Sequence, residues 1–139
     1  MSLIVPHVQA GPYTFGMSPD DVKATAASDG VWYDFDYQNG KLVSLRCDID
    51  AVDSLEIGGE NIALMNRLDA ALHVASLSNR YGQAQGGSLY FDDLGIAILQ
   101  FESHIREFWF FADGFDHGEP LQSMTLESIR VYYDEQVAG

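Results

Sequence analysis

Alternation of apolar and polar residues on both sides of a short turn constrains this chain more than any other feature. Odd positions from 31 to 37 are apolar or aromatic, and the even positions between them include Asp34 and Asp36. After Gly40, the residues Val43, Leu45 and Cys47 again share one apolar face. A period of two is typical of strands with one buried side, so the pattern predicts an antiparallel hairpin.

The register of this hairpin depends on the length of its loop. A two-residue turn at 39–40 would set Asp36 opposite Val43 and mix polar with apolar faces. A three-residue loop at 38–40 instead pairs Phe35 with Val43 and keeps the apolar residues together. The pattern therefore favours the three-residue loop, with glycine at its left-handed position.

Two segments have the pattern of helices. Ser18 followed by Pro19 is typical of a helix start, and a helix over 19–27 is expected. Apolar residues recur every three or four positions between 61 and 79, which predicts the main helix there, with Gly82 as its C-terminal cap.

The last third of the chain is rich in strands. Strands are expected at 88–91, 96–101, 105–112 and 126–133, with a four-residue turn at 92–95. Two helices and a run of strands predict an α+β fold, with a mostly antiparallel sheet of about five to seven strands in the order helix, hairpin, helix, meander. At 139 residues the whole chain, 1–139, is expected to form a single domain.

The chain is strongly acidic. Its 21 Asp and Glu against seven Lys and Arg give a formal net charge of −14, which argues against binding to nucleic acid or to anionic membranes.

The sequence favours a cytoplasmic protein. Cys47 is the only cysteine, so no internal disulfide is possible. The chain also shows no secretory signal and no transmembrane stretch. The chain has no recognised nucleophile or phosphate-binding motif, so no cofactor is expected and an enzyme is not favoured.

One loop carries residues that could ligate a metal ion. Asp113, Asp116, His117 and Glu119 lie within seven positions and supply carboxylates and one imidazole. Their spacing matches no recognised metal motif, so no metal is assigned, and the loop is kept as an alternative metal-binding or hydrolase-like site.

Acidic and aromatic side chains are the best candidates for a binding surface. We expect Trp32, Asp34, Asp36, Trp109 and Tyr132 to contact a basic protein partner, since aromatic anchors supply affinity and complementary charge accelerates encounter. A second alternative is an accessory domain that forms a homodimer through its sheet edge, so both monomer and homodimer stay open.

Two short segments resemble known small proteins. The 15–22 segment FGMSPDDV and the 90–96 segment YFDDLGI resemble segments of small bacterial α+β proteins, among them immunity and antitoxin-type proteins and domains similar to the β-lactamase inhibitor protein fold. The resemblance covers about fifteen residues and transfers no functional residue. The resemblance implies a binding protein that neutralises a toxin, and the acidic charge of the chain leads us to expect that this toxin is basic.

Overall fold

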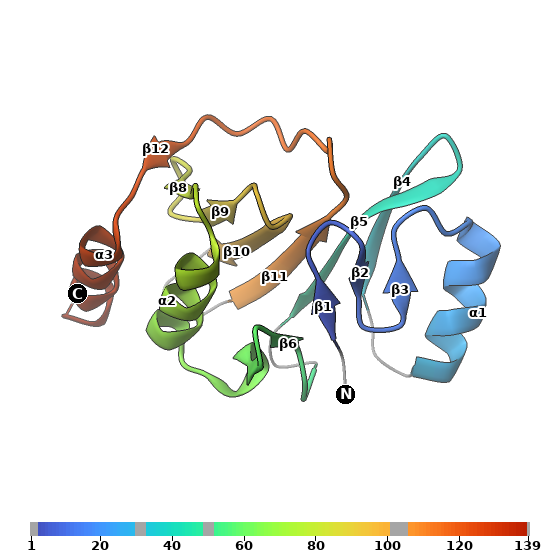
Figure 1. Cartoon of the computed structure of the whole chain (residues 1–139), viewed down its shortest axis with the longest axis horizontal. Helices are drawn as coiled ribbons and strands as arrows, with labels where there is room; N and C mark the ends of the chain where they lie inside the picture. The colour runs from blue at the N-terminus through green and yellow to red at the C-terminus, as the bar shows by residue number, and fades with distance from the viewer. Residues whose placement is uncertain (1–2, 30–32, 49–51, 101–105, 139) are drawn as a thin grey trace.

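Seven strands form one antiparallel sheet that organises the fold (Figure 1). The computed structural model describes residues 3–29, 33–48, 52–100 and 106–138. The strand order is β12-β8-β9-β10-β11-β5-β4. The strands are β4 (Asp34–Gln38), β5 (Lys41–Asp48), β8 (Gly82–Gln83), β9 (Leu89–Phe91), β10 (Ile96–Gln100), β11 (Arg106–Phe111) and β12 (Gln122–Ser123).

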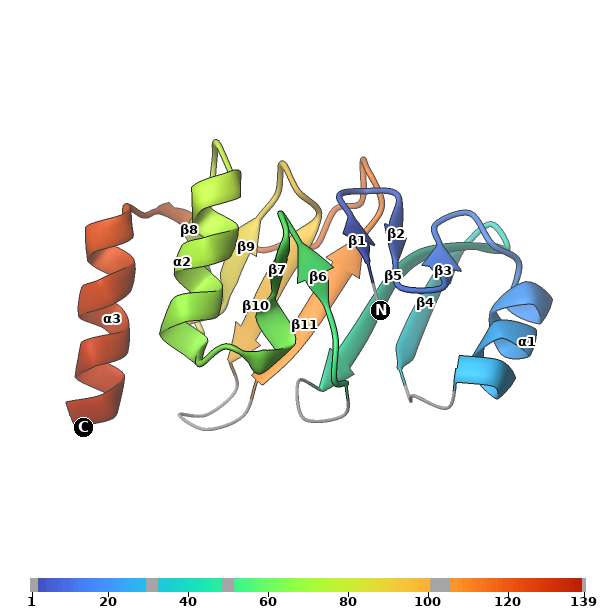
Figure 2. The same ribbon diagram turned by 60° about the horizontal axis from the view of Figure 1, so that its bottom comes forward.

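Smaller elements and helices cover one side of this sheet, as the two views agree (Figures 1 and 2). A three-stranded N-terminal ribbon comprises β1 (Ile4–Val5), β2 (Gln9–Ala10) and β3 (Tyr13–Thr14), and a second ribbon comprises β6 (Glu56–Ile57) and β7 (Glu60–Asn61). The helices are α1 (Pro19–Asp29), the 3-10 helix η2 (Ile62–Leu64), α2 (Arg67–Leu77) and α3 (Leu126–Ala138). The prediction of an α+β fold with a mostly antiparallel sheet is confirmed, but the described residues form three α-helices where two were expected.

The hairpin prediction is wrong in its register. Asn39 and Gly40 both have positive φ, at 52° and 74°, which is the geometry of a two-residue type I′ turn. The register then shifts between Asp36 and Tyr37, so that Phe35 pairs with Leu45 instead of Val43. A bulge at this point leaves one extra residue in β5, and apolar residues still meet apolar residues across the two strands.

The start of α1 is confirmed. The Ser18 hydroxyl accepts a hydrogen bond from the Asp21 N–H at 3.2 Å, as an N-cap does. The predicted main helix over 61–79 is instead divided. Asn61 caps η2 by accepting from the Ala63 N–H, and Asn66 caps α2 by accepting from the Asp69 N–H at 2.8 Å. Two asparagines therefore begin two helices where one was predicted.

Two predictions about the C-terminal half are also wrong. The segment 126–133 is the start of helix α3 and not a strand, and the sheet ends instead at β12. Thr125 begins this helix, because its hydroxyl accepts from the Ser128 N–H at 3.1 Å. Gly82 lies in β8 and does not cap a helix, since α2 ends at Leu77 and Ser78 is its C-cap.

The two sides of the sheet have different neighbours. On the helix side, which we define as the side of α2 and the N-terminal ribbon, alternate strand residues enter the main core, among them Leu45, Phe108, Phe110, Ile96 and Phe91. The opposite side, which we call the loop side, carries a smaller apolar cluster of Ala84, Tyr90, Ala97, Leu99 and Phe111, against which Trp109, Phe115 and Leu121 pack. The crossing loop, residues 112–121, supplies the last part of that cluster on its way from β11 to β12.

Candidate functional site

A transverse row of side chains crosses the loop side of the sheet. Antiparallel pairing sets Asp34 beside Arg46, Arg46 beside Trp109, Trp109 beside Ala97, and Ala97 beside Tyr90. Neighbouring strands lie about 4.8 Å apart, so the carboxylate strand and the indole strand are separated by roughly 10 Å. Acidic, basic and aromatic groups thus lie in one line on one surface.

The two predicted acidic residues of β4 lie on this side and are exposed. The Asp34 carboxylate is 3.8 Å from the Arg46 guanidinium, and the Asp34 side chain is 48% exposed. The Asp36 carboxylate accepts a hydrogen bond of 2.8 Å from the buried Ser44 hydroxyl. An exposed ion pair such as Asp34–Arg46 adds ~0–1 kcal/mol to stability, so the fold depends little on the Asp34 charge.

A cavity of about 410 Å³ opens beside the row. Rings of Tyr90, Trp109 and His117 form its aromatic walls, while Arg46 and Glu119 contribute charge of both signs; its other lining residues are Ala84, Gly86, Ser88 and Leu99. Arg46 Nε and Trp109 Nε1 are buried donors with no hydrogen-bond partner within the described ranges. Donors of this kind lose their hydrogen bonds to water on folding. Their burial therefore lowers the stability of the folded state.

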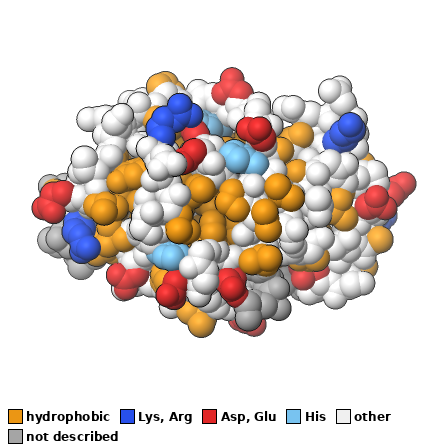
Figure 3. Space-filling model, viewed as in Figure 1, with side chains coloured by type: hydrophobic (Ala, Val, Ile, Leu, Met, Phe, Trp, Pro, Cys, Tyr) orange, Lys and Arg blue, Asp and Glu red, His pale blue; other side chains and the backbone are white. Residues whose placement is uncertain are grey.

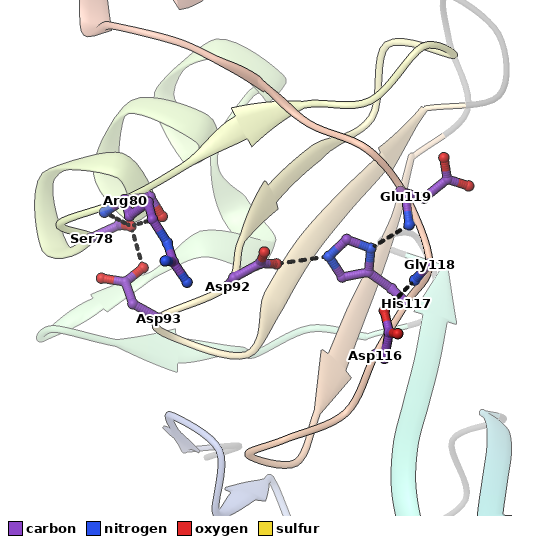
Figure 4. A network of polar contacts seen from close by, with 8 residues as sticks. All are labelled: Ser78, Arg80, Asp92, Asp93, Asp116, His117, Gly118 and Glu119. Atoms are coloured by element: carbon purple, nitrogen blue, oxygen red, sulfur yellow. Dashed lines mark hydrogen bonds and ion pairs between the residues drawn. The ribbon is translucent and has the colours of Figure 1, made fainter.

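His117 fixes the crossing loop to the sheet (Figure 4). Its Nε2 lies 2.9 Å from the Asp92 carboxylate, and its Nδ1 accepts a hydrogen bond of 3.0 Å from the Glu119 N–H. Because Nδ1 is the acceptor, Nε2 carries the proton and donates to Asp92. The imidazole also lies over the Tyr90 ring, with 4.2 Å between ring centroids, and its side chain is only 8% exposed.

The acidic neighbours of His117 do not form a ligand set with it. Asp116 instead accepts a hydrogen bond of 2.8 Å from the Gly118 N–H and shapes the loop, while Asp113 and Glu119 are exposed. Both nitrogens of His117 already have partners. Within residues 3–29, 33–48, 52–100 and 106–138, no three His, Cys, Asp or Glu side chains are placed to hold a metal ion.

Burial keeps the hydroxyl and thiol groups near the sheet neutral. It raises the pKa of Tyr90, an effect that the carboxylates of Glu119 and Asp92 increase and the Arg46 guanidinium opposes. Cys47 is 3% exposed, and burial raises its pKa to about 12. A neutral thiol is a poor nucleophile, so the arrangement gives Cys47 no part in covalent chemistry.

A second hollow lies on the helix side, along the outer strand. A groove of about 300 Å³ runs between α1 and β4, and the rings of Tyr33, Phe35 and Tyr37 form one of its walls. Among the described lining residues Lys23 alone is charged, and the α1 residues Pro19, Val22 and Ala26 form the opposite wall. The groove is therefore mainly apolar and lies beside the edge of the sheet.

The structure brings together three of the five side chains expected to bind a partner. Asp34, Asp36 and Trp109 share the loop side, in neighbouring rows. Tyr132 lies instead on α3 and packs against the main core, so it is separated from the other three. Trp32 falls outside the described residues.

Sequence reasoning missed Arg46 and Asp92 as parts of this surface. The alternation around Cys47 places Arg46 on the polar face of its strand, and this pattern could have identified Arg46 as part of the surface. Nothing in the sequence links Asp92 with His117, because the two lie 25 positions apart and meet only when the crossing loop returns over the sheet.

Comparison with known proteins gives no matching family model, no matching curated protein and no matching solved structure. Among the described helices, none combines the length and the apolar character needed to cross a lipid bilayer.

Proposed function

We propose that this chain is a protein-binding module of the immunity type, acting in the cytoplasm, which blocks a basic partner through the loop side of its sheet. The observation that supports this proposal is the shared position of Asp34, Asp36 and Trp109. Two exposed carboxylates and a partly exposed indole lie within a few strands of one another on a rigid ladder. Aromatic anchors beside complementary charge are the usual composition of binding hot spots.

The net charge of the chain supports a basic partner. The chain carries a formal charge of −14, which attracts cationic surfaces from a distance and accelerates encounter at low salt. On the helix side, which faces the viewer in Figure 1, acidic side chains lie mostly around the margins while hydrophobic side chains run across the middle (Figure 3). The proposal therefore depends on the local arrangement at β4 and not on total charge alone.

A charge-matched pair of variants tests this proposal. D34N/D36N removes two carboxylates from β4 with little change in volume, and D53N/E60Q removes two exposed carboxylates from the segment that includes β7 on the helix side. Each immobilised protein is used to capture proteins from an extract of cells that carry the gene, and the captured protein is identified, purified and titrated by calorimetry.

The expected result is capture of a basic protein that binds wild type and D53N/E60Q equally well. D34N/D36N should bind this protein at least tenfold more weakly, a loss of about 1.4 kcal/mol in binding free energy. Equal loss in both variants would mean that only net charge matters. A captured protein whose affinity is unchanged in D34N/D36N would overturn the proposed surface.

A further inference from the structure

Strand β4 is an edge of the sheet. The strand order ends at β4, which within the described part of the chain pairs with β5 alone. The type I′ turn makes Gln38 and Lys41 the closing hydrogen-bonded pair. Since the direction of backbone groups alternates along a strand, Phe35 and Tyr37 direct their N–H and C=O groups away from β5. An edge of this kind is a template for one more strand.

The two sides of this edge differ in chemistry. Asp34 and Asp36 flank it on the loop side, and the apolar groove of about 300 Å³ flanks it on the helix side. Side chains of an added strand would also alternate between the two sides. Residues on its loop side would lie beside two carboxylates, and residues on its helix side would enter a groove lined by aromatic rings.

A second copy of the chain does not suit this edge. If β4 paired with β4 of another molecule, Asp34 and Asp36 of both strands would share the loop side. Like charges opposite one another across paired strands are destabilising. The same carboxylates would attract a strand that carries Lys or Arg.

We propose that β4 accepts a strand from the basic partner, in which Lys or Arg alternates with apolar residues. This inference rests on the proposed function and gives it a binding mode, in which main-chain hydrogen bonds supply affinity and the alternation supplies specificity. Strand β4 has five residues, so the added strand spans about five residues, or roughly 17 Å.

A synthetic peptide of sequence Lys-Val-Lys-Val-Lys, capped at both ends, is the probe. Its control is Lys-Lys-Lys-Val-Val, which has the same composition and charge without the alternation. Binding is followed by chemical shifts and amide exchange of the ¹⁵N-labelled protein. We expect the alternating peptide to bind about tenfold more tightly, to shift β4 and α1 resonances, and to slow exchange of the Phe35 and Tyr37 amides. Equal affinity of the two peptides, or shifts confined to other elements, would overturn the inference.

Tyr37→Pro removes one outward N–H from the edge, and Tyr37→Thr removes the ring but keeps that N–H. Proline is compatible with an edge strand when its missing N–H faces solvent, and circular dichroism checks that the fold is kept. We expect Tyr37→Pro to bind the alternating peptide about fivefold more weakly than Tyr37→Thr, the effect of one main-chain hydrogen bond.

The same two variants, applied to the captured partner, separate the two proposals. A partner that binds both Tyr37 variants equally but discriminates against D34N/D36N would exclude strand addition and leave the proposed function standing. A partner insensitive to D34N/D36N would exclude the proposed surface itself.

Discussion

Adjacent residues of β11 provide a direct test of how the sheet is oriented. Phe110 is 1% exposed on the helix side, where it lies opposite Leu45 and Ile96 and stacks near Phe108 with 6.1 Å between ring centroids. Trp109 faces the loop side and is only partly buried. Replacing each residue by alanine should therefore have unequal effects on stability.

The magnitudes follow from what each ring contacts. Truncating a buried phenylalanine costs about 3–5 kcal/mol, because transfer energy and a cavity both contribute. Trp109 makes edge contacts with Phe115 and Tyr90, at 5.4 and 6.3 Å between centroids, each worth ~0.5–1.5 kcal/mol beyond burial. Its removal also relieves the buried and unpartnered Nε1, whose desolvation costs ~1–3 kcal/mol. We expect the free energy of unfolding to fall by about 4 kcal/mol in Phe110→Ala and by about 1–2 kcal/mol in Trp109→Ala.

Urea unfolding followed by far-ultraviolet circular dichroism measures both variants, since tryptophan fluorescence changes in one of them. Val131→Ala is the control, because Val131 is 47% exposed on α3 and its truncation should change the free energy of unfolding by less than ~0.5 kcal/mol. If Trp109→Ala destabilised the protein as much as Phe110→Ala, the indole would be as deeply buried as the Phe110 ring. The place of Trp109 as a partly exposed anchor in the loop-side row would then be refuted.

Three further outcomes follow from single contacts. His117→Ala should lower the free energy of unfolding by about 2 kcal/mol in urea titrations, because it removes the hydrogen bond to Asp92 and an aromatic contact; an unchanged midpoint would mean that the crossing loop is not fixed there. Gly95→Ala should destabilise the protein by more than ~1 kcal/mol in the same assay, since φ at Gly95 is +68° and an added Cβ would meet the Phe111 carbonyl; wild-type stability would contradict this crowding. Burial raises the pKa of the Cys47 thiol from 9.0 to about 12, so above pH 9 the unfolded state loses its proton first and stability should fall as the pH rises towards 12. Cys47→Ala should remove that part of the decline, and an identical pH profile for variant and wild type would show that the thiol contributes nothing to it.

Local signals allowed much of the fold to be predicted. The cap at Ser18 placed α1, and the apolar runs of β10 and β11 placed two central strands. Such signals depend on neighbours a few residues away, so they are visible in the sequence. The hairpin register was different, because a three-residue loop and a two-residue turn with a bulge both bring apolar residues together.

The error at α3 has a similar cause. Ile129, Val131 and Tyr133 alternate in the sequence, but Thr125 and Ser128 form a helix cap, and Ile129 with Tyr132 has the spacing of a helix face. Short segments can satisfy both periods, and the cap decides between them.

The candidate site was predictable only in part. Alternation alone placed Asp34 and Asp36 on one face, and this did not depend on the loop length. Which residue lies beside each of them does depend on register, and the predicted register, with Phe35 opposite Val43, did not place Arg46 beside Asp34. The cavity beside Trp109 was beyond prediction, because it needs the return of the crossing loop over the sheet.

Asp34 and Asp36 have two consequences at the sheet edge, and both arise from the same charges. An uncovered edge strand invites pairing with other chains, and charged side chains are a common means by which proteins prevent it. Carboxylates prevent pairing between identical acidic edges, yet they lower the free energy of a basic strand in the same position. Neutralising them as D34N/D36N should therefore weaken partner binding and also increase self-association, which sedimentation at high protein concentration can measure. Control variants such as D53N/E60Q should change neither, because their carboxylates lie away from the β4 edge.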